Sequence, residues 1–393
     1  MEDAEFEAWH RLAHTTGLSR AAARALLKAC GSAQAAAQLG ADEVAALAGT
    51  RAATAWRAAP GPNGQARLLA ARRWREGPQR HVLALGEPNY PELLLHAPDP
   101  PLLLYVQGEA ALLRASPAHS RMLAVVGSRQ PTPAGRAHAR AFSRAFAQAG
   151  VTVVSGLAMG VDAAAHEGAL EGGGPTVAVT GTGPDLVYPS RHRDLAARIA
   201  AQGAIVSEYP PGTPSRAEHF PQRNRIIAGL AHGTLVVEAA LQSGSLITAR
   251  LAAESGREVF AIPGSIDSPQ SRGCHALIRQ GALLVEAAHD VLAELGWAPA
   301  AAPPAPAPAR GETDSPGGAS GPAPAQAGPE PRPTSGAVRV LLEALGFEPA
   351  DLDTLALRTG MPGPELAARL LELELEGRVN RMPGGLFQRC GRA

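Results

Sequence analysis

The chain has 393 residues, 45% of them apolar and only 4% aromatic, and its formal net charge is zero. Such a length exceeds what one hydrophobic core usually fills, so we expect two or three domains. A zero net charge excludes a nucleic-acid binder that depends on overall positive charge, but it permits a local basic patch. Lys28 is the only lysine, so a P-loop ATPase with its Gly-x-x-x-x-Gly-Lys motif is excluded.

The cysteines and the apolar segments indicate the cellular setting. Cys30, Cys274 and Cys390 are far apart and form no Cys-x-x-Cys pair, which fits neither a disulfide framework nor a structural zinc site. No segment resembles a signal peptide, and no run of 18 apolar residues predicts a membrane span. We therefore expect a cytoplasmic protein with no metal, no cofactor and no membrane contact.

Residues 1–75 predict a small helical module, because they are rich in Ala, Leu and Arg and contain no convincing strand. The Leu18–Ser19 pair follows Gly17 and predicts the cap of a helix that begins near Arg20. Two interpretations stay open. The module is either a nucleic-acid-binding unit of the SAM or helix-hairpin-helix kind or a plain packing module, and the second is favoured.

Residues 76–297 alternate short β-rich runs with Ala-rich helical segments, which predicts βαβ units and a mostly parallel sheet covered on both faces. We therefore predict an extended Rossmann-like α/β domain. Several runs end in Gly or Ser, and ligands bind at the carboxyl ends of such strands. The predicted strands are Leu123–Val126, Val151–Val154, Thr176–Val179, Ala204–Val206, Thr234–Val237, Val259–Ile262 and Leu283–Val285.

The last hundred residues divide in two. Residues 298–336 are dominated by Pro, Ala and Gly, which predicts a disordered linker. Residues 337–393 predict a winged-helix domain with helices over Val338–Leu345, Asp353–Thr359 and Pro364–Glu376, followed by a hairpin over Arg378–Arg389. Such domains bind duplex DNA or proteins. The third helix is rich in Glu, which favours protein contact or weak DNA contact.

The first candidate binding feature is Gly127–Ser128–Arg129, directly after a predicted strand. The next helix is predicted to be capped by Thr132, with Pro133 in its first turn. We expect backbone N–H groups, this helix N-terminus and the Arg129 guanidinium to converge on a phosphate. No acidic residue occurs between positions 109 and 162. The further arginines of this helix, Arg136, Arg140 and Arg144, are predicted to form a solvated face.

A second feature, from Ser155–Gly156 to His166, places glycines between a strand and a helix, where a phosphate can approach closely. Alone it is weak, because it is not a full Gly-x-Gly-x-x-Gly fingerprint. Asp162 and His166 are four residues apart and would share a helix face as an acid–base pair. The favoured interpretation is structural: Asp162 caps the helix and His166 donates to a carbonyl.

A third feature is the Ser243–Gly244–Ser245 turn, which leads from a strand into a helix that carries Thr248. This is another arrangement that cradles anions. Glu238, at the end of that strand, is placed where a catalytic acid would lie. With no histidine or metal cluster predicted beside it, catalysis is the less favoured interpretation.

A fourth feature is the stretch FPQRNRIIAGL, residues 220–230. Phe220 offers a ring to an unstacked base. In a helix Arg223 and Arg225 point about 200° apart, so only one can face a ligand. We expect Arg223 to contact a phosphate, and Arg225 and Asn224 to tie the segment to the sheet.

Together these motifs resemble the DNA-processing protein A (DprA, or Smf) family. The matching segments are VGSR (126–129), SGLAMGVDAAAH (155–166), VYP (187–189), SEYPPG (207–212), FPQRNRIIAGL, VVEAALQSGSLITA (236–249), IPG (262–264) and LIRQGALLVE (277–286), and DPPLLLYVQG upstream also fits. The resemblance implies a non-enzymatic protein that binds single-stranded DNA, protects incoming strands in natural transformation and helps load the RecA recombinase. It also implies a homodimer and contact with single-strand-binding protein.

Carried over to this chain, the family pattern assigns a phosphate pocket to Gly127, Ser128 and Arg129 and a stacking role to Phe220. Ser155, Gly156, Ser243, Gly244 and Thr248 would supply further contacts. Two positions depart from the pattern: Ala217 stands where a lysine is frequent, with Arg216 and Arg223 as possible substitutes, and Gly273–Cys274–His275 replaces a Gly-x-Asn sequence. The second departure bears on the contact that the Asn makes in the family and on details of self-association.

Two other functions compete with DNA binding. A nucleotide phosphoribohydrolase would use Glu238, but such enzymes carry a Pro-Gly-Gly-x-Gly-Thr motif and this chain has SGSLITA. A sequence-specific repressor would act through residues 337–393 and would require duplex affinity.

Overall fold

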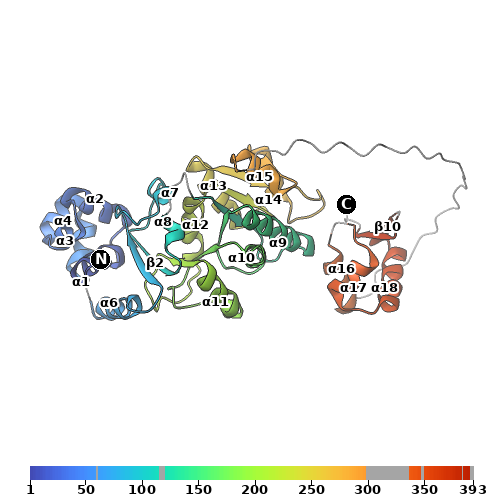
Figure 1. The fold of residues 1–393 in the computed structure, drawn as a ribbon, viewed down its shortest axis with the longest axis horizontal. Coiled ribbons are helices and arrows are strands. Elements are labelled where there is room, and N and C mark those ends of the chain that lie inside the picture. The colour runs from blue at the N-terminus through green and yellow to red at the C-terminus, as the bar shows by residue number, and fades with distance from the viewer. Residues whose placement is uncertain (59–60, 115–119, 298–335, 347–348, 383, 390–393) are drawn as a thin grey trace, which may run out of the picture. The chain divides into compact units, whose positions relative to one another are not determined.

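The computed structural model describes residues 1–58, 61–114, 120–297, 336–346, 349–382 and 384–389 (Figure 1). The chain forms two compact units, residues 1–292 and 293–393. The predicted linker lies outside the described residues, apart from its last residue, Gly336, which begins a helix. The other domain boundaries stay a prediction.

The N-terminal segment is helical, as predicted. Ser19 caps the second helix by accepting the Ala22 N–H at 3.1 Å, and Gly31 ends it in the left-handed conformation with φ 76°. Buried side chains such as Trp9, Leu26 and Trp56 form a core that extends to Ala84 and Leu103 of the neighbouring sheet. The helices are α1 (Asp3–His14), α2 (Arg20–Cys30), α3 (Ala33–Ala37), α4 (Ala41–Ala48), α5 (Thr50–Arg57) and α6 (Pro62–Arg75).

The sheet has the order β1-β2-β6-β5-β4-β3-β7-β8-β9. All neighbouring strands from β6 to β9 in this order are parallel, whereas β1 and β2 extend the sheet in antiparallel pairing. The strands are β1 (Arg80–Ala84), β2 (Leu103–Gly108), β3 (Met122–Val126), β4 (Thr152–Ser155), β5 (Thr176–Thr180), β6 (Ala204–Ser207), β7 (Gly233–Val236), β8 (Glu258–Ala261) and β9 (Leu283–Leu284).

Each strand predicted from the sequence is confirmed to within one residue at either end. The antiparallel pair β1–β2 was not predicted as strands. The helices of this part are α7 (Glu92–Leu95), α8 (Ala111–Arg114), α9 (Pro133–Gln148), α10 (Val161–Glu171), α11 (Arg193–Gln202), α12 (His219–Leu230), α13 (Ser245–Glu254), α14 (Arg272–Arg279) and α15 (Ala288–Glu294), with a 3₁₀ turn at Ser190–His192.

Helices cover both faces of the sheet, as the alternation of strands and helices predicted. Val177 and Val179 of β5 share one buried cluster with Ile226 and Ile227 of α12. Ala178, between those valines, belongs to a different cluster that includes residues of α10 and α11. Because successive strand residues point to opposite faces, α12 lies on one face of the sheet and α11 on the other.

The strand order places a topological switch point between β3 and β7. The chain proceeds from β3 towards β4, β5 and β6 on one side, then crosses back through α12 to β7 on the other side. In open parallel sheets, ligands bind in the crevice outside the carboxyl ends of the strands at such a point. The loops after β3 and β7 are therefore where a site is expected.

The C-terminal unit contains α16 (Gly336–Leu345), α17 (Leu352–Thr359), α18 (Gly363–Leu375) and an antiparallel pair, β10 (Val379–Met382) and β11 (Leu386–Arg389). Asp351 caps α17 by accepting the Thr354 N–H, and Gly360 ends that helix with φ 68°. This helix, helix-turn-helix and hairpin order confirms the predicted winged-helix domain.

Candidate functional site

A cavity of about 590 Å³ lies at the switch point. Loops that follow β3, β4 and β7 form its wall together with the first turns of α12. Its lining includes most of the residues predicted from the sequence: Gly127, Ser128, Arg129, Phe220, Arg223, Asn224, Ser243, Gly244 and Thr248. The predicted residues Ser155, Gly156 and Arg225 lie outside the lining.

The β3 loop is packed tightly against its neighbours. A Cβ atom on Gly127 would lie 2.7 Å from a methyl carbon of Val161 and 2.9 Å from the carbonyl oxygen of Glu238. The backbone N–H of Ser128 donates to that same carbonyl at 2.7 Å. The loop backbone is therefore largely committed to the fold, and the exposed Arg129 side chain is its main polar group towards the cavity.

Arg129 and Phe220 form a cation–aromatic pair in the cavity wall. The guanidinium carbon of Arg129 lies 5.4 Å from the centroid of the Phe220 ring, and the exposed Tyr188 ring lies 5.4 Å from the same ring. Within the described part of the chain, no carboxylate lies within ion-pair distance of Arg129. A positive charge and an aromatic face are thus presented side by side.

The N-terminus of α9 corrects one prediction. Thr132 caps this helix by accepting the Gly135 N–H at 3.0 Å, as expected. However, Glu238 accepts both the Thr132 N–H at 2.8 Å and its hydroxyl at 2.5 Å. The positive end of α9 is therefore neutralised by a carboxylate of the chain itself and does not converge with Arg129 on a ligand.

The same contacts define the role of Glu238. Both of its carboxylate oxygens accept hydrogen bonds from Thr132, and its side chain is absent from the cavity lining. A Cβ atom on Gly135 would lie 2.2 Å from the Glu238 carboxyl carbon, so the carboxylate is also closely packed. This position suits a structural anion better than a catalytic acid, which would have to reach bound substrate.

The N-terminus of α13, in contrast, opens into the cavity. Ser243, Gly244 and Ser245 all line it, and the first turn of α13 contains no acidic residue. The Ser243 and Ser245 hydroxyls lie 2.7 Å apart and bond to each other. This helix end, with its partial positive charge and two hydroxyls, is suited to hold an anion.

Arg223 does not extend towards a ligand as the sequence predicted. Its side chain is only 4% exposed, and its guanidinium donates to the backbone carbonyls of Gly156 and Val179. It also lies 3.8 Å from the buried carboxylate of Asp162. Burial between two carbonyls and a carboxylate holds Arg223 in place. Arg223 is therefore a buried part of the cavity wall, and its guanidinium does not extend into the open cavity.

Asp162 and His166 form no acid–base pair. Asp162 accepts the N–H groups of Gly156 and Ala158 at 3.2 and 3.3 Å, so it organises the loop after β4. Burial raises the pKa of its carboxyl, and the Arg223 guanidinium opposes that shift.

His166 is fully buried and contacts the same loop after β4, but it forms no hydrogen bond with Asp162. Its Nδ1 lies 2.7 Å from the Thr176 hydroxyl, which itself donates to the Val153 carbonyl, and its Nε2 accepts the Leu157 N–H at 3.3 Å. Its partner is thus a hydroxyl and not the carbonyl expected. Burial lowers its pKa to about 3, so the imidazole is neutral near pH 7.

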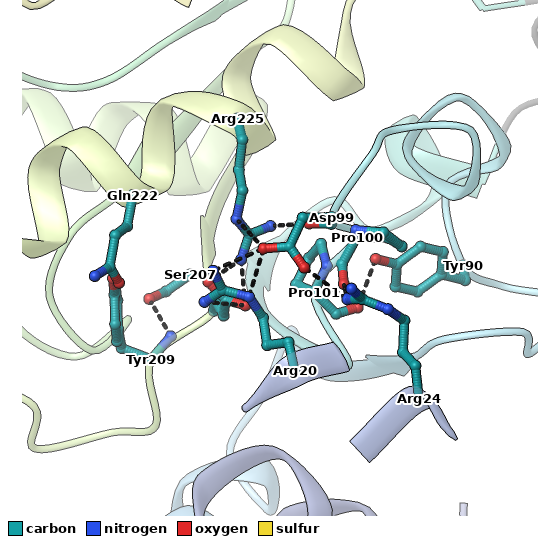
Figure 2. A network of polar contacts seen from close by, with 11 residues as sticks. Arg20, Arg24, Tyr90, Asp99, Pro100, Pro101, Ser207, Tyr209, Gln222 and Arg225 are labelled. Carbon is teal, nitrogen blue, oxygen red and sulfur yellow. Dashed lines mark hydrogen bonds and ion pairs between the residues drawn. The ribbon is translucent and has the colours of Figure 1, made fainter. Parts of the chain in front are cut away.

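Arg225 is a largely buried cation of α12, with a side chain that is 11% exposed. Its guanidinium forms an ion pair with Glu208, in which Nη2 contacts both carboxylate oxygens, and Nη1 donates to the Asp99 backbone carbonyl at 2.6 Å (Figure 2). Two arginines of α2 complete the cluster, because Arg20 and Arg24 contact the Asp99 carboxylate at 2.7 and 2.6 Å. We call these five residues the docking cluster.

The docking cluster fastens the N-terminal helices to α12. Sequence analysis assigned Arg225 a structural role but did not find its partners. Both acids lie in segments that had been singled out, Asp99 in DPPLLLYVQG and Glu208 in SEYPPG. The two acids could therefore be recognised as parts of motifs, but nothing in the sequence shows which distant arginine each acid contacts.

Fold and site together define a Rossmann-like α/β protein with an additional winged-helix domain and, at its switch point, an open cavity that presents a cation and an aromatic ring. The family model of DNA recombination-mediator protein A matches residues 81–296, and the model of the DprA winged helix domain matches residues 322–385. The chain therefore belongs to the DNA recombination-mediator protein A (DprA/Smf) family.

Comparisons with individual relatives support the same family assignment. The chain is 44% identical to protein Smf of Escherichia coli over 317 residues, which cover 79% of this chain and 78% of that protein. It is 46% identical to the DNA processing protein DprA of Streptococcus pneumoniae over 205 residues, covering 52% of this chain and 71% of that protein.

Two solved structures share the fold. The X-ray structure of DprA from Streptococcus pneumoniae matches with a TM-score of 0.63 and 35% identity, covering 75% of this chain and 98% of that one. DNA processing protein A from Helicobacter pylori, described for its single-stranded DNA binding mode, matches with a TM-score of 0.50 and 30% identity, covering 55% and 95%.

The described residues contain neither a metal-binding cluster nor a membrane-spanning helix. They hold no group of three or more His, Cys, Asp or Glu side chains placed to bind a metal ion. Of the helices described, none is both long and apolar enough to cross a bilayer.

Proposed function

We propose that the cavity at the carboxyl ends of β3 and β7 binds single-stranded DNA without chemical turnover. A phosphate would lie between Arg129 and the open N-terminus of α13, and a base would stack on Phe220. One observation carries the proposal: an arginine with no carboxylate partner in the described chain lies over an aromatic ring, inside a cavity whose lining includes a single carboxylate, Asp162, already paired with Arg223.

The other residues divide into contacts and supports. Gly127, Ser128, Ser243, Gly244 and Thr248 line the cavity and would offer backbone or hydroxyl contacts. Ser155, whose hydroxyl donates to the Val125 carbonyl at 2.7 Å, and Gly156, against which Arg223 packs, would act through the shape of the cavity. Arg223 and Asn224 would hold α12 in place, since the Asn224 amide donates to the Gly244 carbonyl at 3.2 Å.

We further propose a cellular role in line with the family. The protein would act in the cytoplasm during natural transformation, as a homodimer that protects incoming single strands and helps to load the RecA recombinase, with single-strand-binding protein as a further partner. What supports this is the family membership, the DNA-processing name of the Streptococcus pneumoniae relative and the single-stranded DNA binding described for the Helicobacter pylori protein.

A comparison of single-stranded and double-stranded DNA binding by the full-length protein over a range of salt tests the proposal. We expect tighter binding of the single strand, because a stacking ring reaches only unstacked bases. Equal affinity for both forms would contradict it. Recombinase loading is a separate test, in which the protein should speed RecA filament formation on strands coated with single-strand-binding protein.

A further inference from the structure

A second groove lies beside the candidate site, between α6 and the loop that follows β6. It has a volume of about 370 Å³, within the range of small-ligand pockets. It begins at His219, the residue directly before Phe220 of the candidate site. The linings of the groove and of the cavity therefore meet at two consecutive residues at the start of α12.

The groove is positively charged. Arg67 of α6 lines one wall and Arg216 the other, both exposed, and no carboxylate belongs to the lining. In the described residues Arg67 has no carboxylate within ion-pair distance. Arg216 is 3.9 Å from Glu218, but both side chains are more than half exposed, so this pair is weak.

An aromatic face borders the same groove. The Tyr209 ring stacks on His219 with centroids 3.9 Å apart and planes inclined by 16°. His219 is fixed in turn by the Gly181 carbonyl at 2.9 Å from its Nδ1, and the Tyr209 hydroxyl donates to Gln222 at 3.2 Å. Tyr209 is therefore held as a preformed ring next to two cations.

The N-terminal helices keep Arg67 in this position. The docking cluster joins α2 to α12, the helix whose first turn carries His219 and Phe220 (Figure 2). Arg225 and Glu208 are each about nine-tenths buried, whereas Arg20 and Asp99 on the α2 side are each about one-third exposed. The wall formed by α6 is therefore part of the same compact unit as the candidate site.

From this geometry we propose that the groove is a second nucleotide subsite, in which Arg67 and Arg216 hold the next phosphate of a bound single strand. The N-terminal helical module then contributes directly to DNA binding and is more than a packing unit. This inference rests on the proposed function, because it extends the path of the same strand.

The test uses the full-length protein and two strands: the thymidine dinucleotide TpT, whose single phosphate cannot occupy the cavity and the groove together, and an oligo-dT strand of about 20 nucleotides, which exceeds the site sizes of single-strand binders. Arg67→Gln should weaken binding of the long strand about fivefold at about 0.1 M salt and reduce the salt slope by about 0.7, the value for one lost phosphate contact. Binding of the short strand, held at the Phe220 cavity, should not change.

Arg73→Gln is the matched control, since Arg73 is exposed on the same helix but does not line the groove. Arg67→Lys should restore most of the affinity. The inference is overturned if Arg67→Gln behaves like Arg73→Gln on the long strand, or if both strands lose affinity equally. Arg129→Ala separates the two proposals, because it should weaken binding of both strands. If it weakens binding of neither strand, the proposed function fails independently of the groove.

Discussion

Two helices begin beside the switch point, and their N-termini are used in opposite ways. At α9, Glu238 accepts hydrogen bonds from the Thr132 N–H and hydroxyl, so a carboxylate of the chain occupies the positive helix end. At α13, the first turn holds no acidic residue, and Gly244 opens into the cavity. Both look alike in sequence, as small residues between a strand and a helix.

The difference shows what makes a helix N-terminus a binding site. The partial charge of the helix end attracts any anion, including one supplied by the protein. Glu238 and Thr132 are 106 residues apart in the chain, so the neutralisation of α9 becomes visible only in the fold. Substitution of a residue that holds the fold should therefore lower stability, whereas substitution of a residue that faces the ligand should lower affinity.

The largest effect is expected for Arg223→Met. Arg223 is buried, and its removal leaves the Asp162 carboxylate buried without its cation. Breaking a buried ion pair from one side costs about 3–5 kcal/mol. Urea unfolding should show this loss of stability. The double variant with Asp162→Asn should lose less than the sum of the single variants, and purely additive losses would contradict the pairing.

Phe220→Ala should affect binding and not the fold. The ring is half-buried at the cavity wall, and stacking in single-strand binders contributes about 1–3 kcal/mol per base. We expect a loss of this size in affinity for single-stranded DNA, measured by fluorescence anisotropy, with an unchanged unfolding midpoint. Phe220→Trp should retain binding. If Phe220→Ala binds like the wild type, the ring is not a stacking platform.

Stability should fall in mild acid because of His166. Its pKa is lowered to about 3 in the folded state, against 6.5 for the free side chain, so the unfolded chain takes up the proton first. The stabilisation by this group is therefore complete above about pH 6.5 and is lost as the pH falls towards 3, at about 1.4 kcal/mol per pH unit.

Urea unfolding between pH 7 and 5 measures this slope. The variant His166→Asn, which cannot take up a proton in this range, should show a flatter dependence on pH. A wild-type stability that stays constant over the same interval would contradict the burial of a neutral imidazole.

The smallest effect is expected for Glu238→Gln. Removal of the charge from the N-terminus of α9 should cost about 0.3–1 kcal/mol of stability, while single-stranded DNA affinity stays unchanged. The same variant tests the enzyme alternative. Nucleotide hydrolysis by the wild type that disappears in Glu238→Gln would favour a phosphoribohydrolase and contradict the structural role.

Local sequence signals predicted much of the fold. β-rich runs located β3 to β9, and cap residues such as Ser19 and Thr132 located helix starts. Strand positions and helix starts depend on residues close together in the chain, so a local sequence pattern is enough to predict them. β1 and β2 were missed because their antiparallel pairing adds an extension that the βαβ alternation does not predict.

The site was predicted less completely, for a physical reason. The cavity gathers most of the expected residues, because the carboxyl ends of parallel strands meet at one edge. Which polar side chains remain available depends on contacts across the fold. Counting helix turns separated Arg223 from Arg225 but could not show that the first is buried against Gly156 and the second against Glu208.

The central claim is that Arg129 contacts a phosphate of bound single-stranded DNA. The most direct test is the slope of log affinity against log salt concentration for the wild type and Arg129→Ala, with Arg136→Ala as control, since Arg136 is exposed on α9 outside the cavity lining. The account predicts a slope reduced by about 0.7 for Arg129→Ala and unchanged for Arg136→Ala. Unchanged affinity and slope in Arg129→Ala would contradict it.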